Sequence, residues 1–424
     1  MVTRYYNAKI FTEGKIIDGE IIVYNDLIAH IGEPVVGSMA DEEVDLHGKY
    51  VFPGLKNAHT HSPMTFLRNK AEGFPLDRWL KEQIFPYEAV LRPDECYWFT
   101  KLAILEYVKG GITMASDMYF MLNPIAQACA ESGFRNVIMP GINNIMIKEG
   151  DSVQKMLDEN FIHLQDNYVR YRVGIHAEYT CTEKLLKEVS EYVNDRGEPV
   201  FVHMSETQKE VDECIARHGK TPVEYFRDLG LFNAGGAVYH MVHPLKDDLK
   251  ILKEMNVSVV TCPASNFKLA SGVAPVKEML DMGLTLGIGT DGAASNNRLD
   301  MFRETYLLAV NQKVKYNDAN AISPKDVLKM ATYGGADVTG MSLCRELKQN
   351  QFADFIVVDM DKVNTWPADD IVCAIVYSGG PSNIYMTVIN GKVVYKDGEY
   401  FINEDVDRIY SKCKESLKAI KERV

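Results

Sequence analysis

Two histidines that lie two residues apart, His59 and His61, form the first candidate site in the chain. Side chains at positions i and i+2 project from the same face of a β-strand, so both imidazoles could reach one metal ion. Residues two apart on an α-helix do not face each other. The pair alone is equally compatible with two histidines that lie close together by chance, because short motifs match by accident. A metal site therefore needs further ligands downstream.

Further polar residues occur where apolar, β-branched runs of the sequence end. They are His176, His203 with Glu206, His240 with His243, and Asp291. Each histidine alone is more often a hydrogen-bonded core or surface residue than a ligand, and an aspartate after a glycine-rich strand can be a helix N-cap. Three histidines and a carboxylate together suit a borderline metal such as zinc or iron, which takes nitrogen and oxygen ligands.

Such a site predicts hydrolytic chemistry. A metal with an open coordination position lowers the pKa of a bound water to about 7. A base must then take the proton and return it to the substrate, and Glu206 lies three residues after His203. Residues i and i+3 point to opposite faces of a strand, so the chain must leave β-geometry after His203 if Glu206 is to point inward. The residues alone do not decide between His240 and His243 as the donor to the attacked centre.

The elements that must position these residues are short apolar runs that alternate with helical segments, as in β/α repeats around a parallel sheet. The expected strands cover residues 55–61, 112–117, 135–141, 171–176, 199–204, 236–241, 257–263 and 284–291. Expected helices include residues 94–109, 123–132, 151–167, 183–196, 246–255 and 274–282. Eight such units predict an α/β fold, a (β/α)8 TIM barrel, whose chemistry lies at the carboxyl ends of the strands.

A second, smaller domain is expected because the chain has 424 residues and single cores usually stop growing at roughly 250–300 residues. Short strands precede the barrel and return after residue 345, where Asn390-Gly391 predicts a hairpin turn. We therefore predict that residues 1–52 and 346–424 form a small β-sandwich domain from both chain ends, with a charged amphipathic helix over residues 403–424. Residues 53–345 then form the catalytic barrel.

Composition limits the class of partner. The net charge of −13 argues against a nucleic acid polymer and gives no basic face for an anionic membrane. No apolar run reaches the roughly 18 residues of a membrane span, and the first residues lack a signal-peptide pattern. The eight cysteines are scattered singly, which is typical of reduced thiols. We expect a cytoplasmic protein that acts on a small molecule.

The chain resembles the amidohydrolase superfamily, in particular its S-adenosylhomocysteine/5′-methylthioadenosine deaminase and triazine chlorohydrolase branch. The resemblance covers nearly the whole chain and rests on five motifs, of which the last two are long and specific. They are Pro53-Gly54-Leu55 before His59-Thr60-His61, His203 with Glu206-Thr207, His240-Met241-Val242-His243, Pro263-Ala264-Ser265-Asn266-Phe267-Lys268-Leu269, and Gly289-Thr290-Asp291-Gly292-Ala293-Ala294-Ser295-Asn296-Asn297.

The resemblance implies one divalent metal per chain, zinc (Zn) in the first place and iron (Fe) as the alternative. Its implied ligands are His59, His61, His203 and Asp291. Glu206 is implied as the proton shuttle from water to a ring nitrogen, His240 as the group that polarises the attacked centre, and Asp291 as a further carrier of a proton to the leaving group. A single metal is expected because His176 stands where binuclear relatives carry a lysine.

Substrate contacts implied by the resemblance are Trp79 for stacking, Glu88 for the ribose hydroxyls, and His176 and Ser295. Two features depart from the family pattern. Glu178 follows His176 where a proline-containing form is usual, and Lys148 is the only cation in the loop over residues 141–148.

The predicted function is a metal-dependent deaminase of an aminated heterocycle, most directly an adenine nucleoside of the adenosine, 5′-deoxyadenosine, 5′-methylthioadenosine or S-adenosylhomocysteine type. The products would be the inosine compound and ammonia. Alternatives are a triazine or chlorinated-heterocycle hydrolase, a free nucleobase deaminase, and a non-catalytic metal-binding barrel. A homodimer or homotetramer is expected.

Overall fold

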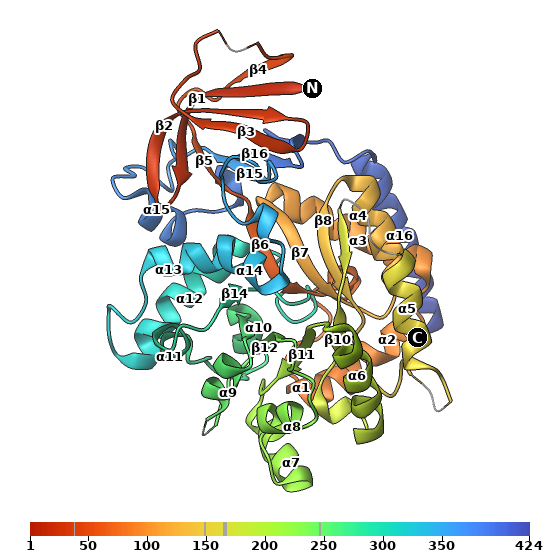
Figure 1. Cartoon of the computed structure of the whole chain (residues 1–424). Helices are drawn as coiled ribbons and strands as arrows, with labels where there is room; N and C mark the ends of the chain where they lie inside the picture. The colour runs from red at the N-terminus through yellow and green to blue at the C-terminus, as the bar shows by residue number, and fades with distance from the viewer. Residues whose placement is uncertain (38, 148–149, 164–167, 246) are drawn as a thin grey trace.

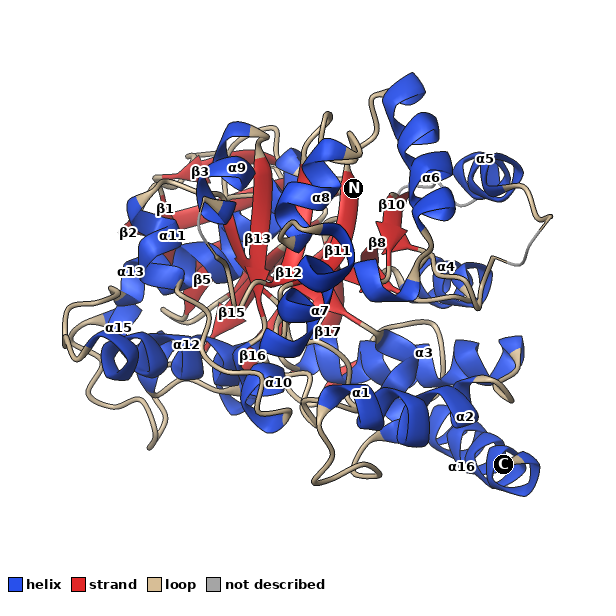
Figure 2. Cartoon of the chain, turned by 90° about the horizontal axis from the view of Figure 1, so that it is seen from below, coloured by secondary structure: helices blue, strands red, loops and turns tan. Residues whose placement is uncertain are grey.

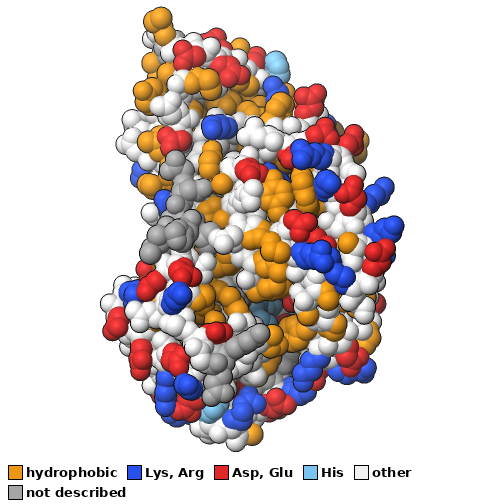
Figure 3. Space-filling model, turned by 90° about the vertical axis from the view of Figure 1, so that its right-hand side faces the viewer, with side chains coloured by type: hydrophobic (Ala, Val, Ile, Leu, Met, Phe, Trp, Pro, Cys, Tyr) orange, Lys and Arg blue, Asp and Glu red, His pale blue; other side chains and the backbone are white. Residues whose placement is uncertain are grey.

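The computed structural model describes residues 1–37, 39–147, 150–163, 168–245 and 247–424. Parallel strands form a barrel with helices around it, and a mainly antiparallel sheet from both chain ends lies beside one end of the barrel (Figure 1). Seen from below, the strands occupy the middle of the molecule and helices surround them (Figure 2). On the face in Figure 3, acidic and basic side chains are intermingled. Among the described residues, no helix combines the length and apolar character that crossing a bilayer requires.

The barrel strands pair in parallel in the orders β6-β7-β8-β9 and β10-β11-β12-β13-β14. They are β6 (Leu55–Thr60), β7 (Ile112–Met118), β8 (Arg135–Met139), β9 (Val169–Tyr171), β10 (Val173–Ile175), β11 (Val200–Met204), β12 (Gly236–His240), β13 (Val257–Thr261) and β14 (Leu286–Ile288). The backbone N–H of Asp291 donates to the carbonyl of His59 at 2.9 Å, which joins the end of β14 to β6. Eight strand positions therefore surround one axis.

The strand expected over residues 171–176 is divided in the structure. Arg172 separates β9 from β10, and its N–H donates to the carbonyl of Ile138 in β8 at 3.0 Å. Beyond Arg172 the chain pairs with β11, and Ile175 also bridges to Ile142 beyond the end of β8. The division thus marks the point where pairing with β11 begins.

The helices follow the expected alternation, and the expected helix ends at residues 164–167 and 246 lie outside the described residues. The helices of the barrel region are α1 (Leu76–Arg78), α2 (Phe85–Glu88), α3 (Pro93–Lys109), α4 (Leu122–Ser132), α5 (Val153–His163), α6 (Glu183–Arg196), α7 (Gln208–His218), α8 (Pro222–Asp228), α9 (Asp248–Glu254), α10 (Pro263–Lys268), α11 (Val276–Asp281), α12 (Met301–Tyr316), α13 (Pro324–Lys329) and α14 (Gly335–Thr339). Later helices are α15 (Ile371–Tyr377) and α16 (Val406–Arg423). Short helical turns are η1 (Ser62–Leu67), η2 (Trp79–Ile84), η3 (Glu178–Thr180), η4 (Met330–Gly334), η5 (Ser342–Cys344) and η6 (Pro381–Asn383).

The second sheet has nine strands in the order β18-β17-β16-β15-β5-β1-β2-β3, and β4 pairs with β1. They are β1 (Val2–Thr12), β2 (Lys15–Tyr24), β3 (Leu27–Gly32), β4 (Glu42–Asp45), β5 (Tyr50–Pro53), β15 (Phe355–Val358), β16 (Ile384–Ile389), β17 (Lys392–Lys396) and β18 (Glu399–Tyr400). A bridge between Leu27 and Phe352 folds the β3 edge back toward β15. The sheet encloses its own core, which includes Tyr5, Ile21 and Phe355.

The C-terminal helix α16 lies against α3 of the barrel (Figure 1). The thiol of Cys413 is 3.3 Å from the carbonyl of Trp98, and Arg423 pairs with Glu95 at 2.5 Å. The sequence prediction placed this helix with the small domain, whereas these contacts join it to the barrel. The domain limits at residues 52/53 and 345/346 stay a prediction.

Candidate functional site

Four side chains from the ends of three strands converge at the carboxyl end of the barrel. The Nε2 atoms of His59 and His203 are 3.2 Å apart. Oδ1 of Asp291 lies 3.2 Å from Nε2 of His61 and 3.7 Å from Nε2 of His59. His59 lies in β6 and His61 directly follows this strand. His203 lies in β11, and Asp291 follows β14. Parallel pairing of the strands brings these distant positions to one edge.

These spacings fit a tetrahedral or five-coordinate metal. Two ligand atoms that each lie about 2.0–2.1 Å from a tetrahedral zinc are about 3.3–3.4 Å apart. The distances from His59 to His203 and from His61 to Asp291, both 3.2 Å, are close to that edge. Two groups of donors lie close enough to share an ion, His59 with His61 and Asp291, and His59 with His203 and His240, so His59 joins the two. Buried imidazoles together with one carboxylate are the donors that a divalent metal takes.

The other nitrogens of two of these histidines are held by backbone carbonyls. Nδ1 of His61 lies 2.6 Å from the carbonyl of Met118, and Nδ1 of His203 lies 2.6 Å from the carbonyl of His176. A carbonyl accepts, so each Nδ1 carries the proton and each Nε2 presents its lone pair to the centre. The last residue of β7 and the first residue after β10 thus set the tautomers of these candidate ligands.

Asp291 is oriented by three donors of its own. The hydroxyl of Ser265 donates to Oδ2 at 2.5 Å, the hydroxyl of Ser295 donates to Oδ2 at 2.9 Å, and the N–H of Gly292 donates to Oδ1 at 2.7 Å. Ser295 was expected to contact the substrate. In the structure it is buried against Asp291 and does not belong to the described residues that line the cavity.

Protonation within this group also suits metal binding. Burial lowers the pKa of His59 and of His203 well below the usual histidine range, so both rings are neutral. Burial opposes the charge of Asp291, but the hydrogen bond and charge of His61 hold the pKa of this carboxyl well below its usual value. Asp291 in turn raises the pKa of His61 to about 9 despite its burial, so this ring carries a proton that metal binding must displace. His59, His203 and Asp291 are already in the neutral or ionised forms that metal ligands need.

Glu206 points into the same cavity because the chain leaves β-geometry directly after β11. Ser205 adopts a φ of 51°, in the left-handed region, and Glu206 is then 5% exposed. Its Oε2 is 3.9 Å from Nε2 of His240. Burial raises the pKa of Glu206 above that of an ordinary glutamate. The turn that the sequence required between His203 and Glu206 is therefore present.

The structure distinguishes the two histidines after β12. His240 lines the cavity, and its Nδ1 lies 2.8 Å from Oδ1 of Asn266. His243 turns away, and its Nε2 lies 2.6 Å from the carbonyl of Ser271. His240 is therefore the one placed to meet a bound molecule beside Glu206.

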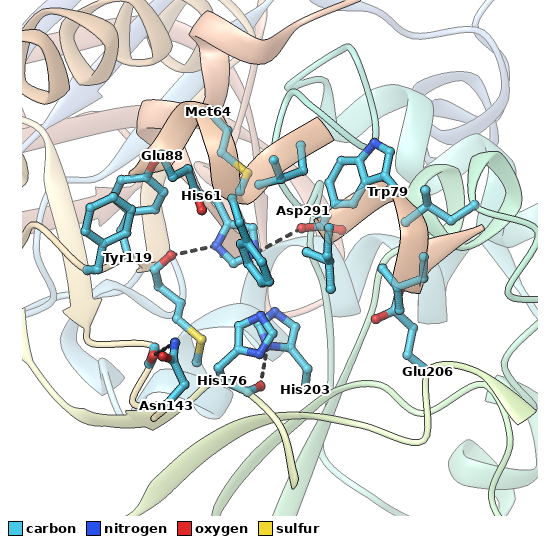
Figure 4. Close-up of a pocket in the computed structure, with 18 of the residues that line it drawn as sticks. His61, Met64, Trp79, Glu88, Tyr119, Asn143, His176, His203, Glu206 and Asp291 are labelled. Atoms are coloured by element: carbon cyan, nitrogen blue, oxygen red, sulfur yellow. Dashed lines mark hydrogen bonds and ion pairs between the residues drawn. The ribbon is translucent and has the colours of Figure 1, made fainter. Parts of the chain in front are cut away.

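Trp79, Glu88 and His176 line this cavity (Figure 4). Three of the candidate ligands line it too, namely His61, His203 and Asp291. Within the described part of the chain, Nε1 of Trp79 and Oε1 of Glu88 are buried without a hydrogen-bond partner. Burial raises the pKa of Glu88 to about 7 and lowers that of His176 to about 4. The cavity wall thus offers the unpaired donor of Trp79, the carboxyl of Glu88 beside the Tyr119 hydroxyl, and an uncharged imidazole.

Tyr119 and Asn143 also line the cavity and were not predicted from the sequence. The hydroxyl of Tyr119 is a further buried group without a hydrogen-bond partner in the described residues. Tyr119 directly follows the last residue of β7, and Asn143 follows the extension of β8 that bridges to β10. Only their positions beyond strand ends could have indicated these two residues. Tyrosine and asparagine are common outside functional sites, so their residue types do not indicate one.

Glu178 and Lys148 are the two residues that depart from the family pattern, and the structure describes only Glu178. Glu178 is buried and carries no free charge toward the cavity, because it pairs with Arg217 at 2.5 Å and with His218 at 2.9 Å. Glu178 therefore joins η3 to the end of α7. Lys148 lies outside the described residues.

Comparison with known proteins identifies the family. Residues 50–394 match the amidohydrolase family. A 5-methylthioadenosine/S-adenosylhomocysteine deaminase of Caldanaerobacter subterraneus subsp. tengcongensis is 37% identical over 422 residues, 97% of this chain and 96% of that protein. A 5′-deoxyadenosine deaminase of Methanothermobacter thermautotrophicus is 35% identical over 402 residues, 94% of each chain.

Solved structures agree. An adenosine deaminase from Xanthomonas campestris with bound zinc superposes with a TM-score of 0.93 and 29% identity, over 99% of this chain and 98% of that one. The atrazine chlorohydrolase of Arthrobacter aurescens TC1, complexed with zinc, has a TM-score of 0.90 at 19% identity, over 98% and 100% of the two chains, and shows the shared fold. These matches confirm the predicted α/β barrel fold. The chain belongs to the amidohydrolase family.

Proposed function

We propose that this chain is a hydrolytic deaminase that converts an adenine nucleoside to its inosine counterpart and ammonia. The observation that carries the proposal is one cavity lined by Glu206, His240 and three of the candidate ligands, while Glu88 presents a buried carboxyl at the wall. The three ligands are His61, His203 and Asp291, and the fourth, His59, is fully buried next to His203. A structural metal site would not need Glu206. Deaminase relatives at 35–37% identity support the same activity.

His59, His61, His203 and Asp291 are the proposed ligands of one metal, and we propose zinc, with iron as the alternative. The relative from Xanthomonas campestris was solved with zinc. A divalent metal here supplies Lewis-acid activation of water at neutral pH.

The chain's own residues account for the proton transfers. Water adds across the C6–N1 bond of adenine, so C6 gains the oxygen and N1 gains a proton. Glu206 takes that proton from the water and delivers it to N1, and its raised pKa allows it to hold the proton between the two transfers. His240 lies where it can bond the new oxygen at C6. Asp291 helps a second proton reach the amino group, the C6–N bond breaks, and ammonia leaves.

Replacement of Glu206 tests the assignment directly. Glu206→Gln keeps the shape of the side chain but cannot carry the proton, so we expect a loss of about 10²–10⁴-fold in kcat for ammonia release. Bound metal per chain, measured by elemental analysis, should not change. Substrates would be adenosine, 5′-deoxyadenosine, 5′-methylthioadenosine and S-adenosylhomocysteine, with guanine and a chlorinated triazine as comparisons. Near-normal turnover in the variant removes Glu206 from the mechanism, and wild-type protein that releases ammonia from none of these compounds contradicts the deaminase proposal.

A further inference from the structure

The position of Glu206 depends on a second buried glutamate on the next helix. We propose that Glu210 is a positioning residue that fixes the Ser205–Glu206 backbone and thereby aims Glu206 into the cavity. The inference rests on the proposed role of Glu206 and goes beyond it, because Glu210 touches neither the ligand group nor the open space in front of Glu206.

The carboxylate of Glu210 holds two consecutive peptide groups. Its Oε1 accepts the N–H of Ser205 at 2.7 Å, and its Oε2 accepts the N–H of Glu206 at 2.8 Å. The side chain is 5% exposed, so water does not compete for these bonds. Both oxygens are used, and each bond goes to the strand-to-helix connection that carries Glu206.

This arrangement differs from ordinary helix capping. Glu210 is the third residue of α7, whose N-cap is Thr207. In a capping box the glutamate at this position bonds back to the N–H of the N-cap residue. Glu210 has this contact with the backbone of Thr207, and in addition it bonds the two residues before the N-cap, Ser205 and Glu206. Its contact therefore reaches past the helix to the catalytic segment.

The same segment is held from its other side by β12. The carbonyl of Ser205 accepts the N–H of Val242 at 3.0 Å and the N–H of His243 at 2.9 Å. Ser205 has a φ of 51°, which a residue other than glycine seldom adopts and which must be held by its surroundings. Glu210 on one side and the chain after β12 on the other provide that hold.

The helix after α7 offers a matched control. In α8, Glu224 is also the third helical residue, and its Oε2 accepts the N–H of the N-cap residue Thr221 at 2.8 Å. This is an ordinary capping box, and Glu224 is not a lining residue of the cavity. Glutamine keeps one oxygen, which is enough for the single N–H that Glu224 accepts but not for the two, of Ser205 and Glu206, that Glu210 accepts, so only Glu210→Gln disturbs the backbone of Glu206.

The experiment compares Glu210→Gln and Glu224→Gln in the full-length, metal-loaded enzyme. The glutamine amide nitrogen cannot accept, so one N–H of the Ser205–Glu206 segment loses its partner. Misplacement of a catalytic group by about 1 Å can cost about 100-fold, and we expect a fall of that size in kcat for Glu210→Gln. KM should change by less than about threefold and metal content should not change, because the wall residues and ligands are intact. Glu224→Gln keeps an oxygen for the N–H of Thr221, so it should change Tm little and leave kcat unchanged.

A double variant shows whether Glu210 acts through Glu206. In the Glu206→Gln background, Glu210→Gln should cause no further loss in kcat, since the group it positions is already inactive. A multiplicative loss, or wild-type kcat in the single variant, would overturn the proposal. Glu210→Asp keeps the charge but shortens the reach, so it should fall between wild type and Glu210→Gln. It also serves if the glutamine variant folds poorly.

A crystal structure of metal-loaded Glu210→Gln supplies a readout that does not need activity. We expect the Glu206 carboxylate to be displaced from His240, while the ligands stay in place. An unmoved Glu206 contradicts the positioning role whatever the substrate is. Absence of deaminase activity in the wild type would instead contradict the proposed function, so the two failures are distinguishable.

Discussion

At the scale of single residues, Glu88 carries the strongest information about the bound molecule. Its carboxyl is buried beside Tyr119, one oxygen has no partner among the residues described, and burial raises its pKa to about 7. A buried polar atom without a partner costs free energy unless a ligand satisfies it. The ionised carboxylate could accept hydrogen bonds from two neighbouring ribose hydroxyls, whereas the protonated form accepts less well.

This predicts a pH dependence. Glu88 must lose its proton to bind the diol, so kcat/KM for adenosine should rise as the pH rises through about 7 and then level off. Glu88→Gln should remove this part of the profile and lower kcat/KM by about 10–100-fold, the cost of one or two hydrogen bonds from a charged group. 9-Methyladenine, which has no ribose, is the matched substrate and should be insensitive to the substitution. An unchanged profile in Glu88→Gln would assign the pKa to another group.

Whether a site residue could be predicted from the sequence depended on its residue type. His59, His61, His203 and Asp291 end apolar runs, and the ends of parallel strands meet, so residue type and spacing placed them among the strand-end candidates. Only the family resemblance separated these four from His176, His240 and His243, and the ligand set stays a prediction. The contact of Ser295 with Asp291 was not predictable, because it depends on how the loop after β14 folds back.

At the scale of elements, Glu178 connects two segments whose contact no pattern in the sequence indicates. It lies in η3 after β10, and its partners Arg217 and His218 end α7, the helix that carries Glu210. The side chain of Glu178 is 4% exposed, whereas that of Arg217 is 39% exposed. The buried carboxylate thus anchors the far end of α7 to the barrel.

Glu178→Gln should therefore lower the free energy of unfolding and leave kcat almost unchanged. Glutamine carries no charge, so its hydrogen bonds to Arg217 and His218 are weaker at this buried position. We expect the free energy of unfolding to fall by about 1–3 kcal/mol. Urea unfolding measures this free energy, and kcat per folded molecule should stay within about twofold, since Glu178 does not line the cavity. Glu213→Gln removes the exposed partner of the same arginine, 3.7 Å away, and should cost at most about 0.5–1 kcal/mol. Equal costs for the two variants would contradict the anchoring role.

Strands and helices could be predicted where the apolar residues of a segment were numerous enough to form a recognisable pattern. The core of each expected barrel strand is present, because a strand buried on both faces gives a continuous apolar run. Strands β4 (Glu42–Asp45) and β18 (Glu399–Tyr400) were not predicted, since both are short and neither has an apolar run. The boundary between β9 and β10 could not be predicted from the sequence. It is defined by pairing, since β9 pairs with β8 and β10 pairs with β11.

At the scale of the whole molecule, one buried ion pair connects the barrel to the second sheet. Arg135 begins β8, and Asp354 lies just before β15. Nε and Nη2 of Arg135 donate to Oδ2 and Oδ1 of Asp354 at 2.7 and 3.2 Å, and Nη2 also donates to Asn390 in the β16–β17 turn. The N–H of Asn390 in turn donates to Oδ1 of Asp354 at 2.8 Å. Both charged side chains are at most 1% exposed.

Asp354→Asn should be among the most destabilising single substitutions at this junction. It retains an oxygen for the N–H of Asn390 but leaves the charge of Arg135 buried without its counter-ion, and breaking a buried pair in this way costs about 3–5 kcal/mol. Asp158→Asn is the matched control, because Asp158 pairs with Arg196 at 2.9 Å with both side chains at least 34% exposed, and it should cost at most about 1 kcal/mol. Urea unfolding at pH 7, followed by circular dichroism, gives both values. If Asp354→Asn cost no more than the exposed control, the two sheets would be held together by apolar packing alone, and the ion pair would serve only to fix their register.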